Sequence, residues 1–285
     1  MEIRHYKDCS TAGLKKLDQQ LINQVIRIAP NLLVRIDQLS GVRLGQACHP
    51  YLQAPAAQAL SRAIAQRKRE LILNSCYRTI AQQAVLFGHY QNNCACGIRA
   101  AARPGASNHN TALSLDIEDA HGWKPYLEMH GWDWIGSFDP MHFDYEGSGV
   151  KDMRWLSVKA FQQLWNYNHP KQKIAEDGVW GTKTYECLIT TPCDGFAKAP
   201  GGNVAPLVIT PDLPKVAAIS SLRINSTGAN VLLLQQALIR VGFFVKVDGH
   251  FGKVTETAVK ACQSRFGLVA DGVVGSATKQ ALGLA

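Results

Sequence analysis

The chain has 285 residues, a formal net charge of +8 and a hydrophobic content of 46%. This length allows about two domains, or three small ones, and the hydrophobic content suffices for a buried core. The charge favours anionic partners, namely nucleic acid, a membrane surface or an acidic wall polymer. The basic residues are scattered apart from Arg67-Lys68-Arg69 at the end of a predicted helix, so we expect no nucleic-acid partner. No run approaches the roughly 18 apolar residues of a membrane span, so none is predicted.

The N-terminus and the cysteines bear on export. The first ten residues lack the basic start and apolar core of a signal peptide. The eight cysteines are an even number, which permits disulfides in an exported protein, and Cys187 and Cys193 are close enough in sequence to form a bridge. Cys94-Ala-Cys96 has no matching pair at zinc-finger spacing, and Cys262 falls on an apolar helical position that is typical of a buried residue.

The first half of the chain mixes helical and strand patterns. Apolar residues at steps of three and four predict an amphipathic helix within residues 10–36, ended near Pro30. We expect this helix to pack on the domain; a helix that binds a partner is the alternative. Further patterns predict helices at 54–69, 80–90 and 123–130, and strands at 70–74, 113–117, 132–135 and 141–145. This mixture predicts an α+β domain that ends near residue 150.

The second half contains an internal repeat. Helices are predicted at 155–165, 232–241 and 255–266, and residues 191–220 have the Pro- and Gly-rich composition of a linker. The pattern Asp-Gly-x-apolar-Gly-x-x-Thr occurs at 177–184, 248–255 and 271–278. Residues 158–162 also match residues 259–263. We expect the glycines to supply turns with positive φ and a helix to begin just after them. Such repeats usually bind or space rather than catalyse.

Four residues between 109 and 142 suggest a metal site. His109, Asp116 and His142 suit Zn²⁺, and a catalytic zinc site needs three protein ligands and one open position. We therefore predict that these three hold zinc and that Asp139 handles the proton. Alone, the His109 and Asp116 pair is weak evidence, because short motifs often match by accident and ordinary polar residues are the alternative.

These residues carry a resemblance to a known family. Residues 107–116 resemble the Ser-x-His-x-x-(Gly/Ala)-x-x-x-Asp motif of the zinc D-alanyl-D-alanine carboxypeptidases and L-alanyl-D-glutamate endopeptidases, a VanY-like and endolysin-like family. Residues 139–143 resemble its acid-x-x-His-(Phe/Tyr) motif, and residues 74–79 with Gln83 resemble its Ser-Gly-Tyr-Arg-(Ser/Thr)…Gln segment. The resemblance covers about residues 45–146. It implies an α+β zinc peptidase domain of the hedgehog/D,D-peptidase-like fold.

The resemblance also implies a role for each matching residue. The zinc ligands would be His109, Asp116 and His142. Asp139 would be the acid/base that takes a proton from the attacking water and gives it to the leaving amine. Arg78 would bind a substrate carboxylate or polarise the carbonyl oxygen, and Ser107 would contact substrate or orient the site. Departures from the family are Ala112 and Cys76, where glycine is usual, and Asp139, where the carboxypeptidase branch has Glu and the endopeptidase-like branch has Asp.

Other residues near the site have a more ordinary expected role. Asp144, Glu118 and Asp119 are candidate carboxylates for orienting a ligand histidine, but solvated surface charge is the stronger expectation for each. Trp132 and Trp134 could line a cleft or fill a core.

The C-terminal repeats resemble the peptidoglycan-binding domain of cell-wall hydrolases, a small all-α three-helix module. The match is nearly complete from Thr227 to Leu282, whereas the copy at 154–190 lacks a first helix and is degenerate or packs on the catalytic domain. The predicted divisions are a helical extension (1–40), a zinc peptidase domain (41–150), a partial repeat (151–192), a linker (193–221) and a peptidoglycan-binding domain (222–285).

The resemblances together predict a zinc-dependent peptidoglycan hydrolase that cleaves stem-peptide amide bonds as a D,D-carboxypeptidase or an endopeptidase. We expect a monomer at the cell wall, extracellular or periplasmic, with peptidoglycan as both substrate and binding partner. One alternative is a non-catalytic peptidoglycan-binding protein with an inactive peptidase domain. Another is a D,D-dipeptidase that acts on small soluble peptides.

Overall fold

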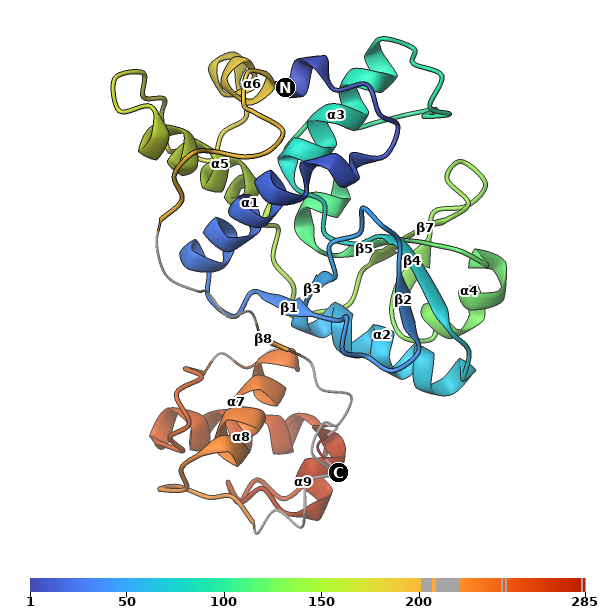
Figure 1. Cartoon of the computed structure of the whole chain (residues 1–285). Helices are drawn as coiled ribbons and strands as arrows, with labels where there is room; N and C mark the ends of the chain where they lie inside the picture. Colours follow the sequence, from blue (N-terminus) through green and yellow to red (C-terminus); the bar gives the residue numbers. More distant parts are fainter. Residues whose placement is uncertain (201–206, 209–220, 242, 244, 283, 285) are drawn as a thin grey trace. The chain divides into compact units, whose positions relative to one another are not determined.

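The computed structural model describes residues 1–200, 207–208, 221–241, 243, 245–282 and 284. The chain divides into two compact units, Met1–Gly147 with Lys151–Pro211, and Asp212–Ala285 with Ser148–Val150 (Figure 1). The first unit mixes helices and strands, and the second is a small helical region, which confirms the predicted classes at this level. Among the described residues, no helix combines the length and apolarity that a membrane crossing requires.

A five-stranded sheet forms one half of the first unit, with strand order β2-β4-β5-β7-β6. Its strands are β2 (Val42–Leu44), β4 (Leu71–Ser75), β5 (Ser114–Ile117), β7 (His142–Tyr145) and β6 (Trp132–Trp134). The β2–β4 pair is parallel and the other pairs are antiparallel. Helices α2 (Ala54–Arg67) and α4 (Ala120–Glu128) share an apolar core with the sheet, to which Leu115, Ile117 and Phe143 contribute buried side chains.

A group of helices forms the other half of the first unit: α1 (Lys15–Ile28), α3 (Ile80–Gln91), α5 (Arg154–Asn168) and α6 (Thr182–Ile189). It is accompanied by a small sheet of order β3-β1-β8, made of β1 (Leu33–Arg35), β3 (Tyr51–Gln53) and β8 (Leu207–Val208). Short 3₁₀ turns occur at η1 (Ile3–His5), η2 (Thr11–Leu14) and η3 (Asn108–Thr111). Helix α1 packs against α5, and its apolar face is buried, so the prediction that it packs on the domain is confirmed.

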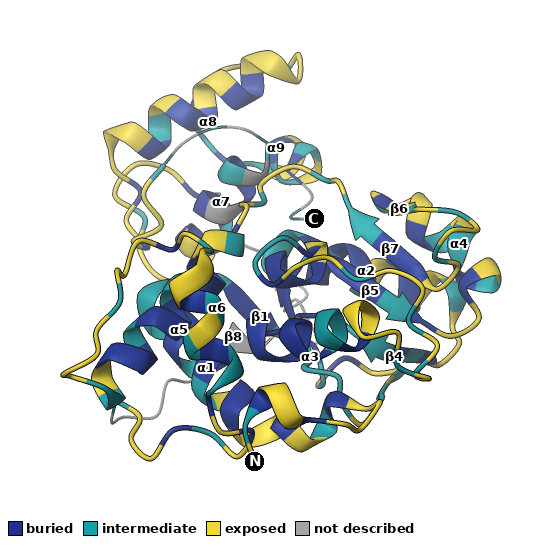
Figure 2. Cartoon of the chain, turned by 90° about the horizontal axis from the view of Figure 1, so that it is seen from above, coloured by how far each residue is buried: buried dark blue, intermediate teal, exposed yellow. Residues whose placement is uncertain are grey.

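The second unit contains helices α7 (Ala229–Arg240), α8 (Lys253–Arg265) and α9 (Ser276–Ala281). Buried and exposed residues alternate along α8, as an amphipathic helix requires (Figure 2). Cys262 lies on the buried side, as predicted, and packs in a core with Phe251 and Val259. Because such a small unit buries little apolar area, specific polar contacts matter more to its stability.

A buried glutamine organises each copy of the repeat. Gln263 Nε2 donates to Asp271 Oδ1 (2.8 Å), the Val273 carbonyl (3.0 Å) and Thr278 Oγ1 (3.1 Å), and Gln263 Oε1 accepts from the Gly272 N–H (2.9 Å). The same four contacts recur around Gln162, with Asp177, Gly178, Val179 and Thr184, and around Gln235, with Asp248, Gly249, His250 and Thr255. One glutamine thus holds the turn and the first turn of the next helix.

The two glycines of the repeated pattern have different roles. The first glycine of each copy has positive φ: Gly178 (73°), Gly249 (74°) and Gly272 (77°). The second precedes α6, α8 or α9 as the N-cap and has extended backbone, as at Gly181 (φ −148°, ψ 176°). The prediction that a helix begins just after these glycines is confirmed, because α6, α8 and α9 each start at the residue after the second glycine. The prediction of positive φ is wrong for the second glycine, because an N-cap residue takes β-region dihedrals.

The disulfide differs from the expected one. Cys9 and Cys96 are bonded, with their Cα atoms 5.2 Å apart, whereas Cys187 and Cys193 are free thiols. The expected bridge is therefore wrong. Cys193 is buried in the helical core, and its backbone N–H donates to the Met1 carbonyl (2.8 Å). The chain after α6 is thus fastened to the N-terminal segment, and proximity in sequence alone does not pair these cysteines.

Candidate metal centre

The centre of the five-stranded sheet carries four polar residues on one face. In the antiparallel pair β5–β7, Asp116 lies directly opposite His142, and Ser114 lies opposite Asp144. Because side chains alternate along a strand, these four residues point to the same side. The intervening Leu115 and Phe143 point into the apolar core. The alternation thus places a polar cluster on one side of the sheet and the core on the other.

His109, which joins the residues of β5 and β7, lies in the 3₁₀ turn η3. Ser107 precedes the turn as its N-cap and accepts a hydrogen bond from the His109 N–H (3.3 Å). Ala112 ends the turn with left-handed backbone (φ 58°, ψ 35°). This conformation explains why glycine suits the position, since a residue with a Cβ costs about 1–2 kcal/mol there. The turn is supported by α5, where Ser157 Oγ donates to the Asn110 carbonyl (3.3 Å).

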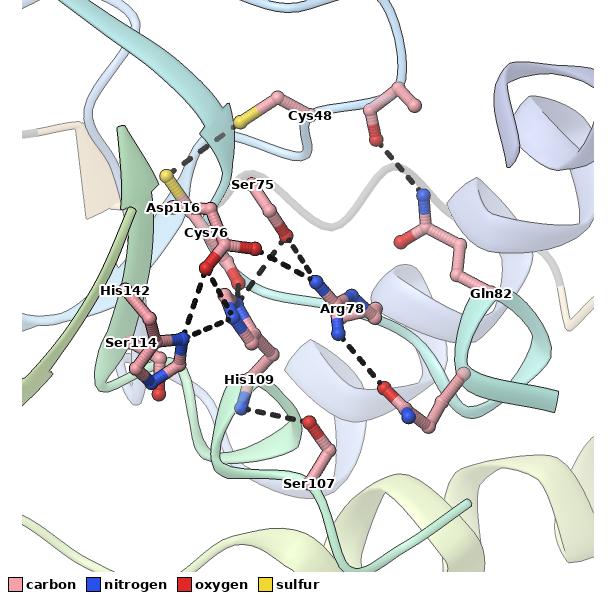
Figure 3. A network of polar contacts seen from close by, with 12 residues as sticks. Cys48, Ser75, Cys76, Arg78, Gln82, Ser107, His109, Ser114, Asp116 and His142 are labelled. Atoms are coloured by element: carbon pink, nitrogen blue, oxygen red, sulfur yellow. Dashed lines mark hydrogen bonds and ion pairs between the residues drawn. The ribbon is translucent and has the colours of Figure 1, made fainter. Parts of the chain in front are cut away.

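The structure brings His109, Asp116 and His142 together (Figure 3). His109 Nε2 lies 3.1 Å from Asp116 Oδ1 and 3.1 Å from His142 Nδ1, and the third side of the triangle, between His142 Nδ1 and Asp116 Oδ1, is 3.0 Å. In a tetrahedral site with bonds of about 2.0–2.1 Å, ligand atoms lie about 3.3 Å apart. The observed triangle is close to that spacing.

Each histidine of the triangle forms a further hydrogen bond through its other ring nitrogen, and these bonds leave the converging nitrogens free to bind a cation. His109 Nδ1 is 2.8 Å from the Cys76 carbonyl, which only accepts, so Nδ1 carries the hydrogen and Nε2 holds a lone pair. His142 Nε2 likewise donates to Asp144 Oδ1 (2.9 Å), so Nδ1 of the neutral ring holds a lone pair. Two nitrogens and one carboxylate oxygen therefore converge, which is a suitable donor set for a divalent metal ion.

The electrostatics of the metal-free centre also favour a cation. Burial lowers the pKa of His142, but hydrogen bonds to Asp116 and Asp144 outweigh this effect and raise it to about 9. Burial and the Arg78 charge hold the pKa of His109 below its usual value. Burial would raise the pKa of Asp116, but contacts with His109, His142 and Arg78 hold it well below its usual range. Without a metal ion His142 therefore keeps a proton, and it would have to release that proton to act as a metal ligand.

Asp144 supports His142 from behind. Besides the contact with His142, its Oδ1 accepts from Ser114 Oγ (2.6 Å) and its Oδ2 from Asn108 Nδ2 (2.7 Å). A carboxylate that holds a ligand histidine fixes the ring orientation and makes it a better ligand. The expectation that Asp144 is solvated surface charge is wrong. Its position two residues after His142 on the same strand is the signal that could have found it, because i and i+2 share a face.

Arg78 is engaged with the protein at the edge of the centre. Its NH2 donates to Asp116 Oδ2 (3.0 Å) and Ser75 Oγ (3.2 Å), and its NH1 donates to Gln83 Oε1 (3.1 Å). Asp116 thus presents one oxygen to Arg78 and the other to the two histidines. Burial lowers the pKa of Arg78, and the charges of Asp116 and Asp139 oppose that effect.

A cleft of about 770 Å³ opens over the centre. His109, Asp116 and His142 line it together with Arg78, Ser107 and Asp139. Asp139 is half-buried, and no side-chain hydrogen bond to its carboxylate is found among the described residues. The Asp139 carbonyl accepts from the His142 N–H (3.1 Å), which ties the loop before β7 to the ligand that follows it. All six sequence-predicted site residues therefore lie in one cleft.

The remaining candidates lie outside this cleft. Asp119 is exposed and pairs with Arg67, and Glu118 is exposed. Trp132 is fully buried in the core, and Trp134 is partly buried and packs against that core.

Comparison with known proteins agrees with this arrangement. Residues 49–181 match the D-alanyl-D-alanine carboxypeptidase (VanY) family model, and residues 227–282 match the putative peptidoglycan binding domain model. The chain is 39% identical over 133 residues to the N-acetylmuramoyl-L-alanine amidase CwlL of Bacillus licheniformis, covering 44% of this chain and 34% of that protein. It is 39% identical over 79 residues to a spore cortex-lytic enzyme of Bacillus cereus, covering 27% of this chain and 30% of that protein.

The chain thus spans about a third of the length of these curated relatives. The VanY match contains the whole cluster of His109, Asp116 and His142. The protein therefore combines a D-alanyl-D-alanine carboxypeptidase domain of the VanY family with a C-terminal peptidoglycan-binding domain.

Proposed function

We propose that the protein is a zinc-dependent peptidoglycan hydrolase that cleaves an amide bond of the stem peptide. The protein would cleave this bond either as a D,D-carboxypeptidase or as an L-alanyl-D-glutamate-type endopeptidase. The observation that carries the proposal is the triangle of His109 Nε2, Asp116 Oδ1 and His142 Nδ1 on a cleft that Asp139 also lines. We further propose that the first unit has the hedgehog/D,D-peptidase-like fold and that α7–α9 form a three-helix wall-binding module.

In this proposal His109, Asp116 and His142 are the zinc ligands. Two histidine nitrogens and one carboxylate oxygen are ligands that zinc prefers, and three protein ligands leave the fourth position open. When bound, zinc would polarise the scissile carbonyl and lower the pKa of a water molecule toward about 7. Cys76 and Asp144 hold the two imidazoles in the tautomers that present lone pairs to the ion.

Asp139 is the proposed acid/base. Its carboxylate lines the cleft without a hydrogen-bonding side-chain partner in the described part of the chain, so it is free to accept a proton from the attacking water. It would then deliver the proton to the leaving amine. Ser107 caps the turn that carries His109, and we propose that it orients the site in this way. Arg78 orients Asp116 through their 3.0 Å contact.

The peptidoglycan-binding domain would hold the enzyme on its substrate. Attachment converts each further encounter into an intramolecular one and raises the local substrate concentration. The net charge of +8 suits an anionic wall. We accordingly place the protein at the cell wall, outside the cytoplasm, with peptidoglycan as its partner. The relatives that are named as an amidase and a spore cortex-lytic enzyme would share such wall attachment with this chain.

The test is an Asp139→Asn variant assayed on purified peptidoglycan, with the metal content measured in parallel. Because general acid–base catalysis contributes about 100- to 10,000-fold, we expect hydrolysis to fall by that factor while the zinc content stays equal to that of the wild type. Asp133→Asn, an exposed carboxylate on β6, is the matched control and should retain activity. Full activity in Asp139→Asn, or a wild-type protein that binds no zinc, would contradict the proposal.

A further inference from the structure

The segment Gly97–Ala102 forms one wall of the cleft and is fastened at both ends. All six of its residues line the cleft. Before it, Cys96 is bonded to Cys9, a residue 87 positions away in sequence. At its end, the Ala102 carbonyl accepts from Gln83 Nε2 (2.7 Å), and Gln83 Oε1 in turn accepts from Arg78. The wall is thus tied to the N-terminal segment and to the residue that orients Asp116.

This wall presents backbone groups that the protein does not use. Within the described residues, no hydrogen bond reaches the backbone N–H or carbonyl groups of residues 97–101. The segment has no regular secondary structure, and all six of its residues are exposed or half-buried. Backbone groups left free along a cleft are suited to pair with the main chain of a bound peptide. Fastening at both ends lowers the entropy lost when a ligand orders the segment.

The two arginines of the cleft differ in their partners. The Arg78 guanidinium is committed to Asp116, Ser75 and Gln83. Arg99 is exposed on the wall, and no ion pair or hydrogen bond to its side chain is found among the described residues. An arginine binds a carboxylate through two parallel hydrogen bonds, which requires free N–H groups. Arg99 is therefore the cleft arginine with a free guanidinium for a substrate carboxylate.

We propose that Gly97–Ala102 is a substrate-docking wall and that Arg99 selects peptides with a free carboxylate. The occupant is the acidic peptide on which the proposed function acts, so this inference rests on that function. The peptide main chain would pair with the free backbone groups, and its carboxylate would pair with Arg99. In this arrangement Arg78 positions Asp116, and Arg99 on the docking wall, rather than Arg78, binds the substrate carboxylate.

The experiment compares Arg99→Ala with Arg103→Ala in the full-length, zinc-loaded protein. Arg103 is exposed and belongs to the same loop, but it does not line the cleft. Each protein is assayed on two synthetic stem peptides that differ only in a carboxylate or a carboxamide. A hydrogen bond to a charged group typically contributes about 10-fold or more to binding, and because Arg99 is exposed we expect the lower end. Arg99→Ala should lower kcat/KM for the carboxylate peptide about 10-fold, mainly through KM, and leave the carboxamide peptide unchanged.

Two more measurements distinguish a carboxylate-binding Arg99 from one that only supports the loop. Arg99→Lys should recover part of the loss, because it restores the charge without the planar fork. An equal loss on both peptides, or equal behaviour of Arg99→Ala and Arg103→Ala, would overturn the role of Arg99. If the wild type cleaves neither peptide, the proposed function fails. Calorimetric binding of the carboxylate peptide then decides the docking wall, which requires weaker binding in Arg99→Ala than in Arg103→Ala.

Discussion

Replacing Asp144 by asparagine tests whether the hydrogen bonds behind the ligands shape the metal centre. The carboxylate accepts from His142, Ser114 and Asn108 at the same time. Asparagine has the same shape but only one accepting oxygen. Its amide group must therefore face either the Asn108 amide or the donors of His142 and Ser114. Asn108 is exposed and can move away, so we expect the fold to survive while His142 loses its negatively charged partner.

The expected magnitude follows from the loss of that partner. Removing a carboxylate or carbonyl behind a metal-binding histidine typically costs about 10- to 100-fold in metal affinity. This range corresponds to about 1.4–2.8 kcal/mol. Because asparagine retains one acceptor for the His142 N–H, we expect Asp144→Asn near the lower value and Asp144→Ala near the upper one.

The assay is a zinc titration in competition with a chromophoric chelator. Asp133→Asn is the matched control, because it removes the same charge from the residue opposite Asp144 on β6 without touching His142. Thermal unfolding of the metal-free proteins checks that each variant is folded. Zinc binding as tight in Asp144→Asn as in Asp133→Asn would refute the supporting role of Asp144.

Three further predictions concern stability and the cleft. Gln263→Leu should lower the unfolding temperature of the second unit in calorimetry, because it leaves the buried Gly272 N–H without an acceptor. Each buried polar group that loses its partner destabilises the fold by about 1–3 kcal/mol. Gln280→Leu, at an exposed position, should not change the unfolding temperature. Hydrogen bonds from the Val273 N–H and the Gln263 side chain lower the pKa of Asp271 in the folded protein. The ionised Asp271 therefore stabilises the fold above about pH 3.8, and this stabilisation is lost as the pH falls through the lowered pKa. Asp271→Asn should therefore be less stable than the wild type at pH 7 and approach it in acid; a stability difference that does not change with pH would contradict this role. Cys96→Ser should raise KM for the peptide substrate by freeing the docking wall, whereas Cys94→Ser, in the same loop, should not; equal KM values would show that the disulfide does not support the wall.

The local part of the structure could be predicted from the sequence. The strand over 113–117 and the helix over 80–90 match β5 (Ser114–Ile117) and α3 (Ile80–Gln91), because their apolar patterns are long enough to show a period. Three strands of three residues, β1 (Leu33–Arg35), β2 (Val42–Leu44) and β3 (Tyr51–Gln53), are too short to show a period, so the sequence does not predict them. The equally short β6 (Trp132–Trp134) is predicted because its two tryptophans alternate. Of the expected linker, residues 201–206 and 209–220 fall outside the described residues. The predicted domain boundaries and residue roles remain proposals.

The site can be predicted where its residues stand in a motif, and it is missed where contacts are non-local. The motif spacing indicates His109, Asp116 and His142, and the structure brings them together. The disulfide joins residues 87 positions apart, so only the folded chain shows the pair. The motif indicates Arg78, but the sequence does not show that its guanidinium is hydrogen-bonded to Asp116, Ser75 and Gln83. That Arg99 lines the same cleft is likewise visible only in the folded chain.

The most direct test of the central claim is mass spectrometry of muropeptides after the full-length protein has digested purified peptidoglycan. We predict a new free amine and carboxylate within the stem peptide while the glycan strands stay intact. Chelator should abolish these products, and added zinc should restore them. Identical products in chelator, or release of whole stem peptides from the glycan as an amidase would produce, would contradict a zinc peptidase built on His109, Asp116 and His142.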